Sequence, residues 1–246
     1  MKWLILFACA VAAGLVFYLP RGKAAAGGSL RPVAVLELFT SEGCSSCPAA
    51  DRLLPKLAGD SGVIALSFHV DYWDRLGWKD RFSSPVYTAR QRRYAGQMKL
   101  ESIYTPQLVI NGRYEVVGSN EGAARQLIRK ALNDSPLVMI RIDEVKRETG
   151  RLTVRCRLEG AVGESRLVAA VVQAHEETQV GGGENRGDRL EHTNVVKALK
   201  EQKAKPVAEV TIELPATGAV EGQRLILFTQ RIKDLHITGA TEWKGK

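Results

Sequence analysis

The stretch FTSEGCSSCPAADRLL, residues Phe39–Leu54, places Cys44 and Cys47 two residues apart at the predicted start of a helix. A continuous β-prone run, Val33–Phe39, precedes the pair, and leucines at helical spacing follow it. The first turn of a helix exposes unpaired N–H groups and a partial positive charge, which stabilise a thiolate. We therefore expect Cys44 to be the exposed, attacking sulfur, and Cys47, one turn further in and partly covered, to resolve a mixed disulfide.

The elements predicted around this pair alternate between strand and helix. They are a strand over Val33–Phe39, a helix from Pro48, a strand over Val63–Asp71, a helix from a Ser84 cap to about Met98, strands over Gln107–Ile110 and Arg113–Gly118, and a helix ending near Asp134. The dipeptide Asn111-Gly112 is a strong hairpin signal between the last two strands, and Pro55 is expected to kink or shorten the first helix. The order β-α-β-α-β-β-α predicts an α/β sheet with helices on both faces.

After Ser135 the pattern changes to alternation with period two, which predicts a β-rich, sandwich-like unit. A glycine-rich segment, residues 181–202, interrupts it and is predicted to be a loop or helix insertion. Cys156 shares the apolar face of its strand and is expected to be a buried, small hydrophobic residue. We therefore divide the chain into residues 1–26, 31–135 and 136–246.

The N-terminus has a short basic start, an apolar run over Trp3–Leu19 and the small-residue triplet Ala24–Ala26. This pattern predicts a secretory signal cleaved after Ala26, with an uncleaved membrane anchor as the alternative. In either case the rest of the chain is exported, to the periplasm or outside the cell, where disulfides persist. Removing residues 1–26, which hold three basic residues and no acidic ones, changes the net charge from +8 to 8 − 3 = +5.

The basic residues do not resemble a nucleic-acid surface, because they are not interleaved with aromatic residues. The cluster of Arg90, Arg92 and Arg93 is instead expected to form a solvated helix face. We therefore expect no nucleic-acid partner.

A second signal supports a redox reading of the cysteines. Thr105-Pro106 stands immediately before a predicted strand, and this topology brings it next to the cysteine pair. The segment Val33–Asp134 resembles the thioredoxin fold. More closely, LELFTSEGCSSCPAAD, HVDYWDRLGWKDRFSSPVYTARQRRYA, YTPQLVING and GENRGDRLEHTNVV resemble a family of exported bacterial thioredoxin-like proteins of undefined function.

This resemblance implies the fold, a cis peptide at Pro106 and an exported bacterial setting, but no particular substrate. The chain departs from thioredoxins proper at two places. Gly43 replaces the usual aromatic residue before Cys44, and Ser45-Ser46 replaces Gly-Pro.

Further polar residues are candidates for the site. Glu37 lies in a strand expected to be covered on both faces, and it either relays a proton for Cys47 or is a structural acid. Residues after the second strand should line the pair or anchor their loop through aromatic packing: His69, Asp71, Tyr72 and Trp73. The segment Glu184–Asn194 is expected either to fold over the redox edge, with His192 near Cys44, or to bond only to itself.

The predicted function is an exported thiol–disulfide oxidoreductase that docks substrate chains on the backbone of Thr105 and Pro106. Its expected partners are protein thiols and disulfides and an unidentified redox partner, and it needs no cofactor. The alternative is a non-catalytic binding or assembly module with a structural Cys44–Cys47 disulfide. A zinc site is disfavoured because zinc prefers four ligands, although His69 or His192 could contribute to one.

Overall fold

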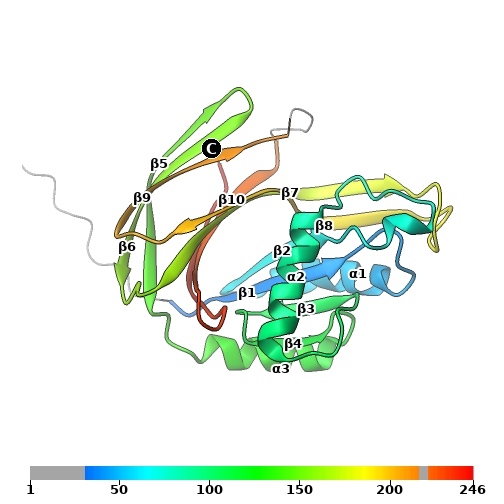
Figure 1. Cartoon of the computed structure of the whole chain (residues 1–246), viewed down its shortest axis with the longest axis horizontal. Helices are drawn as coiled ribbons and strands as arrows, with labels where there is room; N and C mark the ends of the chain where they lie inside the picture. The colour runs from blue at the N-terminus through cyan, green and yellow to red at the C-terminus, as the bar shows by residue number, and fades with distance from the viewer. Residues whose placement is uncertain (1–30, 216–220, 246) are drawn as a thin grey trace, which may run out of the picture.

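The thioredoxin-like half of the chain has the predicted order of strands and helices (Figure 1). The computed structural model describes residues 31–215 and 221–245. Its first half contains β1 (Ala34–Thr40), α1 (Cys47–Ala58), β2 (Val63–His69), the short 3-10 helix η1 (Asp74–Leu76), α2 (Pro85–Met98), β3 (Gln107–Ile110), β4 (Tyr114–Val117) and α3 (Glu121–Leu132). Strands β1 and β2 are parallel, whereas β3 and β4 are antiparallel to their neighbours.

Local sequence signals explain where the helices begin. The Ser84 side chain accepts a hydrogen bond from the backbone N–H of Val86, and Asn120 does the same for Ala123. Pro48 stands in the first turn of α1, where the missing N–H costs nothing. Pro55 lies inside α1, which nevertheless continues to Ala58.

The second half is β-rich, as predicted, so the fold class is confirmed. It contains β5 (Val138–Glu148), β6 (Arg151–Gly160), β7 (Ser165–Gln179), β8 (Arg189–Lys203), β9 (Val207–Glu213), β10 (Gln223–Arg231) and β11 (Ile237–Trp243). Four of these strands extend the thioredoxin-like sheet, which has the order β11-β10-β7-β8-β2-β1-β3-β4. The other three form a separate sheet of order β5-β6-β9.

The prediction of a loop or helix insertion over residues 181–202 is wrong for most of that segment. Arg189–Lys203 is strand β8, which pairs with β7 over its length and meets β2 in parallel between Ser67 and Val195. Buried polar residues at His192 and Asn194 interrupt the apolar alternation by which a strand is recognised. The large sheet therefore runs across the predicted boundary between residues 135 and 136, and the two-part division stays a prediction.

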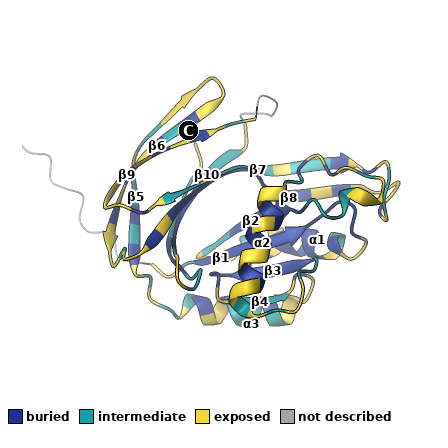
Figure 2. Ribbon diagram, in the orientation of Figure 1, coloured by how far each residue is buried: buried dark blue, intermediate teal, exposed yellow. Residues whose placement is uncertain are grey.

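Three clusters of buried apolar side chains hold these layers together (Figure 2). On one face of the large sheet, residues of β1 pack against α1 and α3. Further along the sheet, the three-stranded sheet packs on alternate residues of β7 and β10, and Cys156 is buried there as predicted. The remaining residues of β7 and β10 join β1 and β2 in a cluster beneath α2.

The prediction of a solvated basic face on α2 is wrong at Arg90, which is 1% exposed. Its guanidinium contacts Glu37 of β1 at 2.5 and 3.0 Å, Glu201 of β8 at 2.9 Å and Gln230 of β10 at 3.2 Å. Tyr94 also donates a short hydrogen bond to Glu37. Arg90 therefore joins the thioredoxin-like strands to the added ones beneath α2.

The predicted signal or anchor, residues 1–26, lies outside the described residues. Among the helices that the structure describes, none has the length and hydropathy needed to cross a membrane.

Candidate active site

The cysteine pair lies at the junction of β1 and α1. Cys47 is the first residue of α1, and its backbone N–H donates to the Cys44 carbonyl at 3.1 Å. Cys44 sits in the turn before the helix, where the backbone curves past exposed Ser45 and Ser46. The local sequence forces this arrangement, because Pro48 has no N–H and suits only the first turn of a helix.

Thr105 and Pro106 reach the cysteines from the start of β3, as predicted. Their peptide bond is cis. The Thr105 hydroxyl lies 3.2 Å from Cys44 Sγ, and Trp73 Nε1 donates to that same hydroxyl at 2.8 Å. Ser46 Oγ lies 3.3 Å from Cys44 Sγ. Two hydroxyl groups thus contact one sulfur, and Trp73 holds one of them in place.

These contacts separate the two thiols electrostatically. The pKa of Cys44 is lowered to about 6, chiefly because Cys47 donates a hydrogen bond to its thiolate, while burial opposes the shift and Ser46 and Thr105 assist it. The pKa of Cys47 is raised by burial, by that same hydrogen bond to Cys44, and by the negative charges of Cys44 and Asp51. At neutral pH Cys44 is therefore the thiolate and Cys47 the thiol.

The expectation of an exposed Cys44 and a partly covered Cys47 is wrong. Cys44 is 1% exposed and Cys47 0%. The tip of the β7–β8 hairpin, residues 181–188, lies against the turn that carries Cys44. Asn185 Nδ2 donates to the carbonyls of Glu42 at 2.8 Å and Cys44 at 2.9 Å, and the carboxylate of Glu184 accepts from the N–H of Ser45 at 2.9 Å.

Glycines at 181 and 182 allow this close approach. A Cβ on Gly181 would lie 2.8 Å from the Trp78 ring, and one on Gly182 would lie 2.7 Å from the carbonyl oxygen of Gly77. The segment beginning at Glu184 therefore folds over the cysteine turn and does not bond only to itself. We call residues 181–188 the cover.

Glu37 does not lie with the cysteines. Its carboxylate is 0% exposed and is held by Arg90 and Tyr94. Along β1, Glu37 alternates with Leu36 and Leu38, which face α1, so its side chain lies on the opposite face of the sheet from the helix that begins at Cys47. The structure assigns Glu37 the structural role that the sequence left open.

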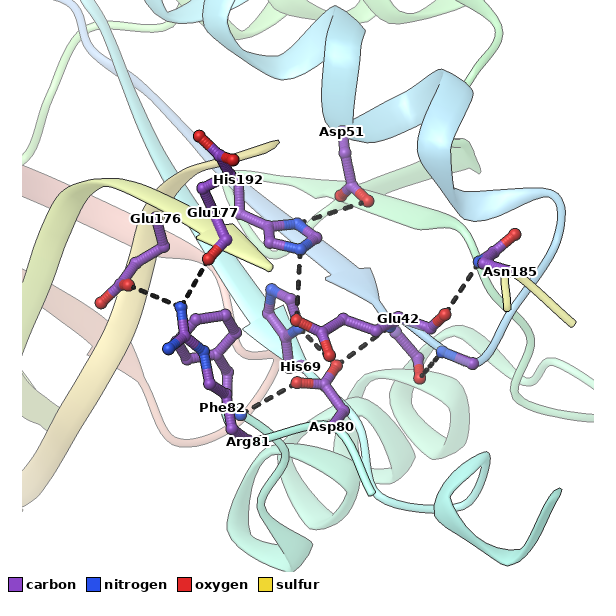
Figure 3. Close-up of polar contacts among 12 residues, drawn as sticks. Glu42, Asp51, His69, Asp80, Arg81, Phe82, Glu176, Glu177, Asn185 and His192 are labelled. Carbon is purple, nitrogen blue, oxygen red and sulfur yellow. Dashed lines mark hydrogen bonds and ion pairs between the residues drawn. The ribbon is translucent and has the colours of Figure 1, made fainter. Parts of the chain in front are cut away.

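A buried cluster of histidines and carboxylates lies behind the cysteine turn instead (Figure 3). His192 of β8 sits between two carboxylates, with Nε2 3.5 Å from Glu42 and Nδ1 3.6 Å from Asp51. His69 lies edge-on to His192, with ring centroids 4.7 Å apart, and its Nδ1 is 2.6 Å from Asp80. We call Glu42, Asp51, His69, Asp80 and His192 the acid–histidine cluster.

His192 is protonated within this cluster at neutral pH. Burial disfavours its charged form, but the nearby carboxylates of Asp51 and Glu42 outweigh burial and raise its pKa to about 9. At the same time, neither ring nitrogen makes a close hydrogen bond within the described part of the chain. The cluster is therefore polar and buried, and the contacts of His192 with its two carboxylates are long.

The remaining predicted residues frame the site. The Asp71 carboxylate accepts a hydrogen bond from the Thr88 hydroxyl of α2 at 2.5 Å, which anchors the loop that carries Asp71. The hydroxyl of Tyr72 is buried, and burial raises its pKa to about 12. The charges of both cysteines contribute to that shift, which places Tyr72 near them.

A metal centre is not indicated. Within residues 31–215 and 221–245, no group of three or more histidine, cysteine, aspartate or glutamate side chains is arranged to hold a metal ion.

The sequence interpretation missed Glu42, Asp51 and Asp80. Asp51 had a usable signal, because it stands four residues after Cys47 and so shares its helix face. Glu42 had none, since its partner His192 comes from a strand that was not predicted. Asp80 had none either, because eleven residues separate it from its partner His69 at the end of β2.

Comparison with known proteins agrees with this architecture. Residues 35–230 match the family described as "Protein of unknown function (DUF1223)". A probable thioredoxin from Archaeoglobus fulgidus is 33% identical over 97 residues, which are 39% of this chain and 87% of that protein. A crystal structure of a protein from Agrobacterium tumefaciens superposes with a TM-score of 0.67 at 27% identity, covering 88% of this chain and 96% of that one.

Proposed function

The chain belongs to the DUF1223 family, and we propose that it is a thiol–disulfide oxidoreductase in which Cys44 attacks and Cys47 resolves. The observation that carries this proposal is the placement of the pair at the start of a helix, with the Thr105 and Ser46 hydroxyls 3.2 and 3.3 Å from Cys44 Sγ, which favours a thiolate at Cys44 and a thiol at Cys47. A purely structural pair gains nothing from such a difference, whereas a nucleophile and a resolving thiol require it.

The reaction transfers two electrons, and each sulfur–sulfur bond that forms is matched by one that breaks. The Cys44 thiolate attacks one sulfur of a substrate disulfide, forming a mixed disulfide and releasing the other substrate sulfur as a thiolate. Cys47 then loses its proton and attacks Cys44. The bond between Cys44 and the substrate breaks, and the second substrate sulfur leaves. The substrate is reduced and the Cys44–Cys47 pair is oxidised; the reverse sequence oxidises a substrate dithiol.

Substrate docking makes use of residues already around Cys44. Thr105 and Pro106 border the sulfur, and Trp73 holds the Thr105 hydroxyl. An extended substrate chain paired with the backbone at Thr105 would present its disulfide to Cys44. The cover must move aside for this, because Cys44 is enclosed while the cover is bound.

The test is disulfide reduction with single cysteine variants. We expect the wild type to accelerate the reduction of insulin by dithiothreitol, Cys44→Ser to lose that activity, and Cys47→Ser to accumulate a mixed disulfide on Cys44. Cys156→Ser is the matched control, since that thiol is buried in another core, and it should retain full activity.

The burial of Cys44 favours one competing function, a binding or assembly module that uses the pair only as a structural disulfide. Equal rates for wild type and Cys44→Ser, with no adduct on Cys47→Ser, would overturn the oxidoreductase proposal and support that alternative.

We further propose that the protein works after export, on protein thiols and disulfides and with a separate redox partner, and without nucleic acid. Export is motivated by the basic start and apolar run of the first 19 residues. N-terminal sequencing of the mature protein tests it: Gly27 as first residue supports cleavage, and Met1 supports an anchor.

A further inference from the structure

The oxidoreductase proposal leaves one step without a proton acceptor. Cys47 must lose a proton to resolve the mixed disulfide, yet its pKa is raised and it is 0% exposed. The acid expected to serve it, Glu37, lies on the other face of the sheet with Arg90. Some other group must take this proton.

We propose that Asp51, which faces His192, accepts the proton of Cys47 when that cysteine attacks the mixed disulfide. The inference rests on the proposed function, because it concerns the second half of that reaction. In this step the Cys47 S–H bond breaks and its proton moves to the Asp51 carboxylate. The Cys47 sulfur bonds to Cys44, and the substrate thiolate leaves.

Helix geometry places Asp51 correctly for this step. Asp51 stands four residues after Cys47 in α1, so both side chains lie on one helix face, and both are buried. The negative charge of Asp51 also contributes to the raised pKa of Cys47. The Asp51 oxygen that faces His192 Nδ1 at 3.6 Å makes no hydrogen bond to any described residue, so it can accept a proton.

The charges around His192 favour uptake of a proton. His192 faces Asp51 from α1, Glu42 from the cysteine turn and His69 from β2, and Asp80 binds the far side of His69. A protonated His192 between two carboxylates leaves one negative charge in excess, and a proton on Asp51 would neutralise it in a buried site.

The side of the cluster next to Phe82 carries further charges. The Phe82 ring lies 5.8 Å from His192, between centroids, and Arg81 and Lys197 lie over that ring at 4.6 and 4.4 Å. Glu176 pairs with both cations, at 3.2 and 3.0 Å. Together these three groups carry one net positive charge on the Phe82 side, whereas the carboxylates that face His192 directly are Glu42 and Asp51.

Asp51 also has a route to solvent. A pocket of about 90 Å³ is lined by Pro48, Asp51, Arg52, Arg189, Leu190 and Glu191. Arg52, Arg189 and Glu191 are exposed, so the pocket opens at the surface between α1 and β8. A proton taken from Cys47 can leave through it without crossing the cover.

His192 is a positioning residue in this scheme. It comes from β8, one of the strands added to the thioredoxin-like sheet, and its Nδ1 lies 3.6 Å from the Asp51 carboxylate. The added half of the molecule would thereby set the rate of a step at the cysteine pair.

The experiment isolates the resolving step. Cys44 is blocked with methyl methanethiosulfonate at pH 4 in a Cys156→Ser background, the pH is raised, and loss of the methylthio adduct is followed by mass spectrometry. The variants are Asp51→Asn and His192→Gln. Glu191→Gln is the matched control, because it lines the same pocket from the exposed side.

We expect the wild-type rate to be nearly constant between pH 6 and 9, because Asp51 rather than hydroxide takes the proton. Asp51→Asn should be slower by at least about tenfold at pH 7, and its rate should rise about tenfold per pH unit. In His192→Gln the loss of the adduct should slow by less, and the pH range over which its rate is constant should shift. Glu191→Gln should match the wild type.

Two results would overturn the inference. One is a wild-type rate that itself rises tenfold per pH unit, which needs no variant to detect; the other is an Asp51→Asn profile that superposes on the wild type. A wild type that resolves the adduct on an Asp51-dependent plateau but cannot reduce insulin would uphold the inference while the proposed function fails.

Discussion

Individual neighbouring side chains stabilise the thiolate of Cys44, so the reactivity of Cys44 should depend on pH in a defined way. Its pKa is lowered to about 6 with Cys47 as the largest cause. A depressed pKa means that the thiolate persists above pH 6 and is lost as the pH falls through that value.

The rate of alkylation of Cys44 by iodoacetamide should therefore rise to a plateau with a midpoint near pH 6. Cys47→Ala removes the main hydrogen bond and should move the midpoint upward, and Ser46→Ala should move it upward by less. A midpoint above 8 in the wild type, the range of an ordinary cysteine, would contradict the assigned role of Cys47.

His192 should link stability to pH in the opposite sense. Its pKa is raised from 6.5 to about 9 in the folded protein. The stabilisation is therefore fully present below pH 6.5 and is lost as the pH rises through about 9. It amounts to on the order of 2–3 kcal/mol for this buried group.

Urea unfolding at pH 6 and pH 9.5 measures this effect. In a Cys44→Ser, Cys47→Ser background, which removes the opposite pH dependence of the cysteine pair, the free energy of unfolding should fall over that interval with His192 present and fall less in His192→Gln. Equal decreases in the two proteins would show that another group is responsible.

At the scale of elements, Arg90 joins α2 to strands β1, β8 and β10. Its guanidinium is fully buried, and removing it leaves the Glu37 carboxylate buried without its partner. Arg90→Ala should therefore lower the free energy of unfolding by about 3–5 kcal/mol, measured by chemical denaturation.

Arg93 provides the matched control one turn along α2. It also pairs with Glu201, but its side chain is 41% exposed. Arg93→Ala should cost at most about 1 kcal/mol. Similar losses for the two variants would contradict a special role for the buried pair.

The elements also show what the sequence could reveal. Strands β1–β4 and helices α1–α3 were predictable because apolar periodicity, the Ser84 cap and the Asn111-Gly112 turn all act locally. Strand β8 was not, because His192 and Asn194 are buried polar residues whose partners lie on other elements. Arg90 was misjudged for the same reason: a buried arginine has the sequence signature of an exposed one until its partners are known.

The residues of the candidate site fall into the same two groups, those that a local sequence pattern reveals and those whose partners lie on distant elements. Cys44, Cys47, Thr105 and Trp73 were found from a motif and a strand order. Glu42 is identified only when β8 brings His192 to it, and Asp80 only when the loop after β2 folds back on His69. Glu37 is predicted on the correct strand, but the sequence does not tell which face of the sheet it occupies.

At the scale of the whole molecule, the added strands both complete the sheet and enclose its redox edge. In Figure 1 the ends of β7 and β8 extend toward α1, where their connecting cover meets the cysteine turn. Loosening the cover should therefore expose Cys44 without changing its chemistry.

The double variant Glu184→Ala, Asn185→Ala removes the hydrogen bonds that hold the cover. We expect Cys44 alkylation at pH 8 to become at least about threefold faster, since each lost bond is worth roughly 1 kcal/mol. Arg186→Ala, an exposed change in the same segment, should have no effect. An unchanged rate in the double variant would show that the cover does not limit access.

Equilibration of the Cys44–Cys47 pair with glutathione buffers tests the central claim most directly. In a Cys156→Ser background, the account predicts a reversible two-electron transition in which the oxidised fraction changes tenfold relative to the reduced fraction for each 29.6 mV. It also predicts that the transition disappears in Cys44→Ser. A pair that remains in one state across the full range of buffers, in the folded protein, would contradict the account.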